Sequence, residues 1–334
     1  MRLLDLLTAA GRDWVSGEAI STQLGISRAA VWKQIEALRA EGYEVEAAPR
    51  RGYRLAARPD KLSVREIEAG LTTQRFGRPV EAHEAIGSTN ERAKELARSG
   101  APEGLLVTAE QQTAGKGRLG RPWQTPAGRA LAMSVLLRPP IPPTAAPRLT
   151  LVAAVAVAEA VRAVTGLPVG IKWPNDLQIA GRKLCGILTE MEAEIEQVRF
   201  VVLGIGLNVN QAAEEFPPEL RETATSLRLA AAEGSASEGG LPVARLPLLQ
   251  AILARLEVRY DQFLAGGWPE LLAAWRELSV TLGRSVRVIP ASGAPIWEGT
   301  AVDVDAEGAL LVRRPDGSTE RVIAGEVSIR PTTA

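Results

Sequence analysis

The sequence predicts an α+β multidomain protein with a winged helix-turn-helix at its N-terminus, a central α/β domain with a mixed sheet, and a C-terminal SH3-like β-barrel. Residues 1–60 place helices before two short strands, residues 80–209 alternate strands with helices, and residues 283–330 hold short strands separated by turns. A chain of 334 residues has room for two or three domains. We expect domains over residues 1–60, 61–278 and 279–334.

The helices of the first domain are predicted from caps and hydrophobic spacing. Leucines at positions 3, 4, 6 and 7 indicate a first helix. Ser16 can cap a short second helix over residues 17–23, and Ser27 can cap a third that runs to about residue 40. On the third helix Val31, Ile35 and Leu38 recur at helical spacing, so they form the expected buried stripe.

Two strands complete the first domain as a wing. They are expected over residues 43–47 and 53–55, with a turn at Pro49-Arg50-Arg51-Gly52 between them. A domain of this type places its third helix in the major groove of duplex DNA. The residues expected to contact DNA are Ser27, Arg28 and Lys33 on the helix and Arg50 and Arg51 on the wing. The alternative is a helical hairpin that contacts protein.

Strand-like and helical segments alternate from residue 61 onward. Helices are expected over residues 64–71, 89–98, 146–164, 244–264 and 269–278, and strands near residues 81–86, 105–110, 130–137, 169–172, 177–179, 184–190 and 198–209. Residues 211–240 are rich in Ala, Glu, Ser and Gly without periodicity, so we interpret them as a mobile surface segment near a site. Turns at Ser292-Gly293, 305–308 and 315–317 then separate the strands of the last domain.

The composition narrows the classes of function. Lys plus Arg and Asp plus Glu both number 39, so any basic surface must be local. The single cysteine, Cys185, cannot form an internal disulfide, which suits a reducing compartment. The N-terminus lacks signal-peptide features, and the most apolar helical stretch, residues 149–158, is too short to span a bilayer. We expect a soluble, cytoplasmic protein without membrane contact.

The single histidine, His83, limits the chemistry. Catalysis by a Ser-His-Asp or Cys-His arrangement is excluded unless His83 takes part, and so is a His-rich metal site. His83 lies in a strand of alternating character and Cys185 in an apolar strand, so both are interpreted as non-catalytic. Catalysis is therefore expected to rely on lysine, arginine and backbone amides.

The central motif is a glycine-rich basic loop, Gln112-Thr-Ala-Gly115-Lys116-Gly117-Arg118-Leu-Gly120-Arg121-Pro-Trp123. Its glycines allow the backbone to close tightly on a ligand, and its cations can meet a carboxylate and a phosphate together. The order of a Walker loop is missing. A solvated basic hairpin turn is the alternative interpretation.

A second motif reads Lys172-Trp173-Pro174-Asn175-Asp176, followed by Gly181-Arg-Lys183-Leu-Cys-Gly186. Asp176 and Lys183 could face each other across a hairpin, where the lysine would neutralise a phosphate and the aspartate would hold magnesium or order the lysine. An exposed hairpin with an ordinary ion pair is the alternative.

Two shorter motifs add to the pattern. Gly87-Ser88-Thr89-Asn90 is a strand-to-helix turn whose polar side chains could bind a polar ring, although helix capping by Ser88 explains it equally. Gly204-Ile-Gly206-Leu-Asn208-Val-Asn210 places glycines within a strand, which permits either close approach of a ligand or a bulge in a buried strand.

Jointly the four motifs resemble the biotin–protein ligase family in order and spacing. The resemblance includes Ala224-Thr225-Ser226-Leu227 and Gly325-Glu326-Val-Ser328-Ile-Arg330. With the N-terminal domain, nearly the whole chain resembles the bifunctional ligases that also repress biotin operons. Two positions depart from the family pattern: Gly87 stands where Asp is frequent, and Lys116 stands where Arg is frequent and so lacks the bidentate fork.

The resemblance implies a reaction and a set of site residues. Biotin and ATP would form biotinyl-5'-AMP with Mg²⁺, and the biotin would pass to a lysine of a biotin carboxyl carrier protein. Lys183 and Arg118 would be the catalytic residues. Biotin-binding residues would be Ser88, Thr89, Asn90, Gln112, Gly115, Lys116, Gly117, Arg118 and Lys183. Nucleotide-binding residues would be Arg118, Arg121, Trp123, Asn175, Asp176 and Asn208, with Asp176 also a magnesium ligand.

The resemblance also implies a switch. Biotinyl-5'-AMP would act as corepressor, and the chain would bind operator DNA as a ligand-promoted homodimer. Two alternatives stay open at this point. One is a lipoate–protein ligase, which would not be expected to carry Lys-Trp-Pro-Asn-Asp or a winged domain. The other is a ligand-responsive transcription factor with an inactive ligase site.

Overall fold

A computed structural model describes residues 3–233, 240–290, 294–323 and 325–329. The chain divides into two compact units, residues 1–60 and 61–334. The predicted turn at Ser292-Gly293 and the motif residue Arg330 lie outside the described residues, as does the 234–239 part of the predicted surface segment.

The first unit has the winged element order that the sequence predicts. Its elements are α1 (Leu3–Ala9), α2 (Gly17–Leu24), α3 (Arg28–Ala40), β1 (Glu44–Ala48) and β2 (Gly52–Ala57). Ser16 and Ser27 cap α2 and α3, because each hydroxyl accepts a backbone N–H three residues on. Val31, Ile35 and Leu38 are buried in the small core, so the predicted stripe is confirmed.

The second unit is built on a seven-stranded mixed sheet in the order β3-β4-β5-β9-β8-β7-β6. Only the β3–β4 pair is parallel. The strands are β3 (Val80–Ile86), β4 (Leu106–Gln112), β5 (Ala130–Leu137), β6 (Gly170–Lys172), β7 (Asp176–Ile179), β8 (Arg182–Ala193) and β9 (Val198–Asn208). The long central strands β5 and β9 carry continuous apolar runs because helices cover both of their faces.

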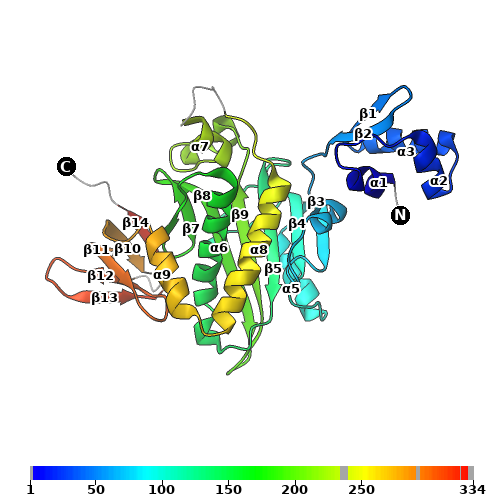
Figure 1. Ribbon diagram of the computed structural model, residues 1–334. Coiled ribbons are helices and arrows are strands. Elements are labelled where there is room, and N and C mark those ends of the chain that lie inside the picture. The colour runs from blue at the N-terminus through cyan, green and yellow to red at the C-terminus, as the bar shows by residue number, and fades with distance from the viewer. Residues whose placement is uncertain (1–2, 234–239, 291–293, 324, 330–334) are drawn as a thin grey trace. The chain divides into compact units, whose positions relative to one another are not determined.

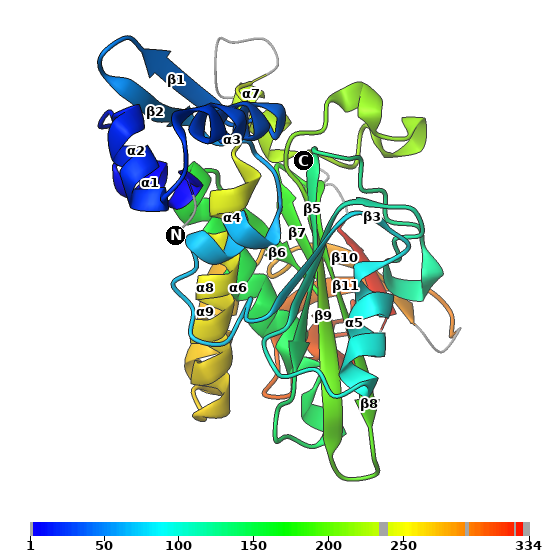
Figure 2. The same ribbon diagram turned by 90° about the vertical axis from the view of Figure 1, so that its right-hand side faces the viewer.

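Helices cover the two faces of this sheet unequally. The long helices α6 (Arg148–Thr165) and α8 (Arg245–Leu264) lie side by side over one face (Figure 1), while α5 (Thr89–Arg98) covers the other (Figure 2). Shorter helices are α4 (Val64–Ala69), α7 (Leu227–Glu233) and α9 (Trp268–Leu278). Alanines on α5 pack against Val107, Leu136 and Phe200, which fixes the N-terminus of α5 above the centre of the sheet.

The apolar segment 143–165, which includes α6, is long and apolar enough to cross a membrane by length and composition. The sequence-based prediction of a shorter apolar stretch is therefore too restrictive. Of its most apolar window, 72% is buried inside the protein, which is the burial of a core helix.

The C-terminal segment forms a five-stranded antiparallel sheet in the order β13-β12-β11-β10-β14. Its strands are β10 (Ser285–Pro290), β11 (Trp297–Val304), β12 (Leu310–Arg313), β13 (Thr319–Val322) and β14 (Gly325–Ile329). The apolar side chains of this sheet join the same core as α6 and α9. This placement holds β14 beside the glycine-rich loop, where the Gly325 carbonyl accepts a hydrogen bond from Arg118.

One prediction about the fold is only partly right. Residues 212–223 are mostly exposed and contain only two short 3-10 turns, as an irregular surface segment should, but residues 224–233 contain a buried turn at Ala224–Leu227 and α7. Thr225 and Ser226 are fully buried although polar: the Thr225 amide donates to the Lys183 carbonyl, and the Ser226 hydroxyl donates to the Gln211 carbonyl. Hydrogen bonds to β8 and to the segment after β9, rather than hydrophobic spacing, hold this turn, so periodicity could not reveal it.

Candidate functional site

A pocket of about 320 Å³ opens where α5 begins, between the glycine-rich loop and strands β8 and β9. Its lining brings together residues that are far apart in the sequence. The predicted site residues that line it are Ser88, Thr89, Asn90, Gln112, Lys116, Gly117, Arg118, Arg121, Trp123, Asn175, Asp176 and Lys183. Gly115 and Asn208 do not line this pocket.

One end of the pocket is a hydrogen-bonded polar cluster. The Thr89 amide and hydroxyl donate to Gln112 Oε1 at 2.9 and 3.1 Å. The Ser134 hydroxyl donates to Asn90 Oδ1 at 2.6 Å and lies 2.8 Å from Thr89 Oγ1. Ser134 is fully buried on β5, so its hydroxyl fixes both side chains from below the pocket. This end of the pocket therefore offers several fixed donors and acceptors to a polar ring.

The glycines of β9 make room for these side chains. A Cβ at Gly204 would collide with the Asn90 amide, and one at Gly206 would collide with the indole of Trp123. The glycines therefore allow close approach by the protein's own side chains, Asn90 and Trp123, and not directly by a ligand. Because any side chain at either position would displace Asn90 or Trp123, these glycines shape the pocket.

The glycine-rich loop folds as a tight hairpin over the pocket. The Trp123 amide donates to the Gly115 carbonyl at 2.8 Å, and the Gly117 amide donates to the Arg121 carbonyl at 2.7 Å. Gly115 approaches the backbone of Trp123 so closely that a Cβ would not fit, which explains why it shapes the loop without lining the pocket.

Arg118 connects this loop to two other segments. Its guanidinium donates to Asn175 Oδ1 at 3.0 Å and to the Gly325 carbonyl of β14 at 2.9 Å. The loop, the Lys-Trp-Pro-Asn-Asp segment and the C-terminal sheet therefore meet at one cation.

The predicted pair across the β7–β8 hairpin is present. Lys183 Nζ lies 2.7 Å from Asp176 Oδ1, and the lysine is 37% exposed. Its backbone is clamped by the buried turn, because its amide donates to the Thr223 carbonyl and its carbonyl accepts from Thr225. The lysine also lies 5.6 Å from the centre of the Trp123 ring. An ammonium group in this position faces both the pocket and the glycine-rich loop.

A second pocket of about 160 Å³ adjoins the first. The two share Pro122, Trp123, Lys183 and Leu220, so the Trp123 indole lies between them. Asn208 lines this second pocket, and its amide group donates to the Thr225 carbonyl and accepts from Gln211. Trp123 Nε1 is buried and has no hydrogen-bond partner among the described residues, which leaves one donor for an acceptor on a ligand.

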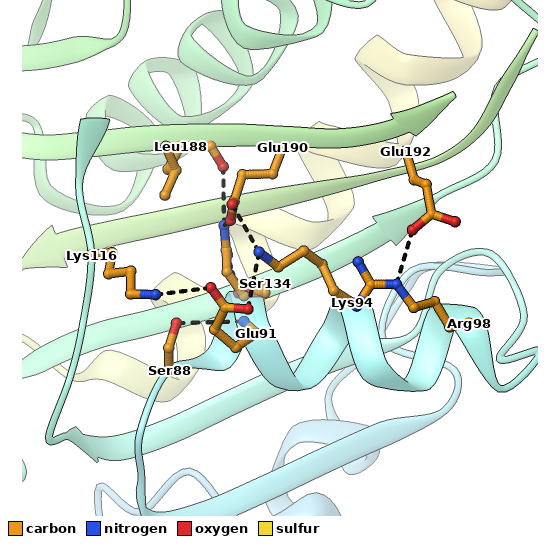
Figure 3. Close-up of polar contacts among 10 residues, drawn as sticks. Ser88, Glu91, Lys94, Arg98, Lys116, Ser134, Leu188, Glu190 and Glu192 are labelled. Atoms are coloured by element: carbon orange, nitrogen blue, oxygen red, sulfur yellow. Dashed lines mark hydrogen bonds and ion pairs between the residues drawn. The ribbon is translucent and has the colours of Figure 1, made fainter. Parts of the chain in front are cut away.

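A row of charged residues beside the pocket was not anticipated from the sequence. It consists of Glu91 and Lys94 on α5, Glu190 on β8, and Lys116 of the loop (Figure 3). Hydrogen bonds from Lys94 hold the pKa of Glu91 below its ordinary value. Burial of Lys94 opposes its charge, but hydrogen bonds to Glu190 and Glu91 outweigh this effect and raise its pKa. The helical spacing of residues 90, 91 and 94 was a signal that these side chains share a neighbourhood.

Three further positions have simple structural environments. Cys185 is fully buried, and burial raises the pKa of its thiol, so it is not a reactive thiolate. His83 bonds Glu81 at 2.7 Å on β3 and does not line either pocket. Among the described residues, no group of three His, Cys, Asp or Glu side chains could hold a metal ion.

The winged unit presents its predicted residues on two elements. Ser27 caps α3, while Arg28 is 75% exposed and pairs with Glu18 on α2. Lys33 is exposed, and so is the large apolar side chain of Trp32 beside it, which its sequence position alone did not mark as a surface residue. On the wing, the guanidinium of Arg51 lies 4.8 Å from the centre of the Trp14 ring.

Comparisons with known proteins agree with this arrangement. A model of the biotin/lipoate A/B protein ligase family matches residues 83–208, an HTH domain model matches residues 1–54, and a biotin protein ligase C-terminal domain model matches residues 281–330. Among solved structures, the biotin protein ligase from Aquifex aeolicus in complex with biotin and ATP has a TM-score of 0.63 at 28% identity, over 76% of this chain and 100% of that one.

Relatives cover nearly the full length. The chain is 44% identical over 315 residues to the bifunctional ligase/repressor BirA of Bacillus subtilis strain 168, covering 94% of both proteins. It is 32% identical over 334 residues to the protein of the same name from Escherichia coli strain K12, covering 99% of this chain and 97% of that one. The chain therefore belongs to the family of bifunctional biotin–protein ligases and repressors.

Proposed function

We propose that this chain forms biotinyl-5'-AMP from biotin and ATP and transfers the biotin to a lysine of a carboxylase carrier protein, and that the same intermediate makes it a repressor. Ligase and repressor activities are those of its family. The assignment of individual residues rests on the geometry of the pocket.

The observation that carries the choice of biotin is the hydrogen-bonded polar cluster at one end of the pocket. The ureido ring of biotin has two N–H donors and a carbonyl acceptor, and Ser88, Thr89, Asn90 and Gln112 offer fixed partners for them. The dithiolane ring of lipoate has no such groups and could not form these hydrogen bonds. The apolar lining from Met133 and Ile187 suits the rest of the bicyclic ring.

In the first step, a biotin carboxylate oxygen attacks the α-phosphorus of ATP, and pyrophosphate leaves. Lys183 and Arg118 supply positive charge where these anions meet, and Lys116 and Arg121 extend that charge along the loop. None of these four side chains forms a covalent bond to biotin or to the nucleotide. Positioning and charge stabilisation account for the rate increase.

In the second step, the amine of the acceptor lysine attacks the acyl carbon of the mixed anhydride, and AMP leaves. The second pocket, with Trp123 at its boundary and Asn208 in its wall, is our candidate for the adenine. The hydrogen bonds of Gly115, Gly117 and Arg118 hold the loop closed over the intermediate. Closure matters because an acyl-adenylate exposed to water hydrolyses.

Magnesium fits this site as a partner of ATP and not as a resident metal. Asp176 is paired with Lys183, and the described residues contain no cluster of three metal-binding side chains. Mg²⁺ is commonly held by substrate phosphates, water and one or two carboxylates. Asp176 is the carboxylate that we propose lies nearest to the metal.

Pyrophosphate release tests this assignment directly. The purified full chain should release pyrophosphate from Mg-ATP when biotin is added and should show no such release with lipoate. Equal rates with both acids would favour a lipoate ligase. Release with neither, in a protein that still binds DNA in response to biotin, would favour the transcription factor with an inactive site.

The winged unit would then read operator DNA in the cytoplasm. Ser27 caps α3, Arg28 and Lys33 lie on that helix, and Arg50 and Arg51 lie on the wing, so one unit offers few phosphate contacts. A biotinyl-5'-AMP-promoted homodimer would place two units on one palindromic site. Sedimentation with biotin and ATP should show a shift from monomer towards dimer, and an unchanged mass would remove the dimer from the proposal.

We expect Lys33→Ala to weaken DNA binding and to reduce its salt dependence. If Lys33 neutralises one phosphate, the slope of log affinity against log salt should fall by about 1, equally for operator and unrelated duplexes. Gln34→Ala removes a neutral side chain from the same helix and should leave the slope unchanged. The measurement is a salt titration of binding, with biotin and ATP present, to a duplex selected from a random pool. An unaltered slope in Lys33→Ala would remove the phosphate contact.

A further inference from the structure

The row of ion pairs beside the pocket connects the glycine-rich loop to the polar cluster. Lys116 of the loop lies 3.1 Å from Glu91, Glu91 lies 3.0 Å from Lys94, and Lys94 lies 2.9 Å from Glu190. Glu190 then accepts a hydrogen bond from the Asn90 amide at 2.8 Å. We call these four residues, Lys116, Glu91, Lys94 and Glu190, the α5 ion-pair row (Figure 3).

The row is set by two matched repeats. On α5, residues 90, 94 and 98 follow each other at intervals of four residues, about 6 Å along the axis. On β8, residues 188, 190 and 192 point to the same side at intervals of about 6.6 Å. Asn90 donates to Leu188 and Glu190, Lys94 to Glu190, and Arg98 to Glu192, so the helix and the strand are joined at three successive levels.

The two ends of the row differ in their contact with solvent. Lys94 is only 16% exposed and holds a carboxylate on each side. The Lys116–Glu91 pair is 54% and 43% exposed, so it is the contact that can open and close without disturbing the core. Glu91 is therefore held from within by Lys94 while one of its oxygens faces the loop.

We propose that Glu91 is a positioning residue that fastens the glycine-rich loop to α5, and that Lys94 and Glu190 tie this fastening to the orientation of Asn90. The inference rests on the proposed function, because it concerns how long the adenylate is retained. A ligand bound at the polar cluster would then favour the closed loop, and the closed loop would favour that ligand, because the α5 ion-pair row connects the two.

The test is the release of biotinyl-adenylate from Glu91→Gln in the full chain. Glutamine keeps the length of the side chain and the backbone N–H that Ser88 caps, but it removes the charge. An exposed ion pair is screened by water, so we expect adenylate to leave about two to five times faster. The single-turnover rate of adenylate formation should stay within about twofold of wild type, since Glu91 does not line the pocket.

Glu95→Gln is the matched control. Glu95 lies on the same helix and pairs only with Arg92 among the interactions described, and it should release adenylate as slowly as wild type. Salt should speed release from wild type but not from Glu91→Gln, which a purely structural role would not produce. Lys116 also lines the pocket, so the pair is tested by a double-mutant cycle: Glu91→Gln should speed release in the wild-type background and should add little to Lys116→Ala.

The outcomes separate this inference from the proposed function. If wild type forms no adenylate, the proposed function fails. If wild type forms it and Glu91→Gln retains it for as long as wild type, the fastening role is overturned, as it is if Lys116→Ala and Glu91→Gln act additively. The fastening role is supported if Glu91→Gln releases adenylate faster than wild type at low salt and equally fast at high salt. It also requires that the effects of Glu91→Gln and Lys116→Ala are not additive.

Discussion

Replacing Lys183 with alanine is expected to reduce the rate of biotinyl-adenylate formation by about 10²- to 10³-fold while the fold stays intact. Removing one fixed donor that faces developing negative charge has an effect of this size. Lys183 meets the condition, because it reaches the pocket from a strand whose backbone is clamped at Thr223 and Thr225. The Lys183 side chain is 37% exposed, but Asp176 is only 17% exposed and loses its partner, so a thermal-unfolding measurement should accompany the rate to show that the fold is kept.

The loss of charge has a second consequence at Asp176. With the lysine gone, this carboxylate would stand unpaired beside the incoming phosphates and would repel them. Lys183→Ala combined with Asp176→Asn, measured at saturating Mg²⁺, separates this repulsion from the magnesium contact proposed for Asp176. A rate above that of Lys183→Ala alone would assign repulsion to Asp176, and a lower rate would assign it the magnesium contact.

Arg182→Ala is the matched control for this experiment. Arg182 is the preceding residue on β8, so its side chain points to the other face of the strand, where it pairs with Glu233 on α7. It should form adenylate at close to the wild-type rate. The measurement is rapid-quench formation of biotinyl-adenylate from saturating biotin and ATP. A wild-type rate in Lys183→Ala would refute the assignment of this residue.

The features predicted most accurately from the sequence are those set by neighbouring residues. Ser16, Ser27 and Ser88 mark the starts of helices because a cap depends on backbone groups two or three positions away. The Asp176–Lys183 pair was also predictable, because a short hairpin must bring its two strands together. The positions of the motifs in one pocket came from the family resemblance and not from local rules.

The parts that were missed depend on contacts across long stretches of chain. Glu190 bonds Asn90 from 100 residues away, and Ser134 bonds it from 44 residues away, so no local pattern marks either one. The buried turn around Thr225 follows the same rule, since its partners lie on β8 and after β9. Asn208 illustrates the limit of motif reading: it lines the second pocket, and its amide is already bonded to Thr225 and Gln211.

Replacing Arg118 with glycine is expected to leave adenylate formation possible but to release the intermediate early. Arg118 donates to Asn175 and to the carbonyl of Gly325, so it joins the loop to two segments that the rest of the fold holds in place. A hydrogen bond from a charged donor is worth about 1.5–3 kcal/mol. Losing that holding energy corresponds to release about 10- to 150-fold faster, since each 1.36 kcal/mol is a factor of ten.

Early release should be visible as a change in what becomes labelled. Free biotinyl-adenylate acylates any accessible lysine, so a bystander protein without a carrier domain should become biotinylated in proportion to the release rate. The expected result is strong labelling of the bystander by Arg118→Gly and weak labelling by wild type. The direct measurement is loss of labelled adenylate from the protein by rapid filtration.

Two further variants separate the lost clamp from added backbone freedom. Arg118→Ala removes the guanidinium with less backbone freedom than glycine, so it should release adenylate nearly as fast as Arg118→Gly. Leu119→Gly changes the next residue, which is 73% exposed and has a positive φ of 57° that glycine adopts readily, so it should behave like wild type. Early release from Leu119→Gly with slow release from Arg118→Ala would assign retention to loop stiffness. The reverse pattern, with Arg118→Ala alone releasing early, would assign it to the bonds that Arg118 makes with Asn175 and β14.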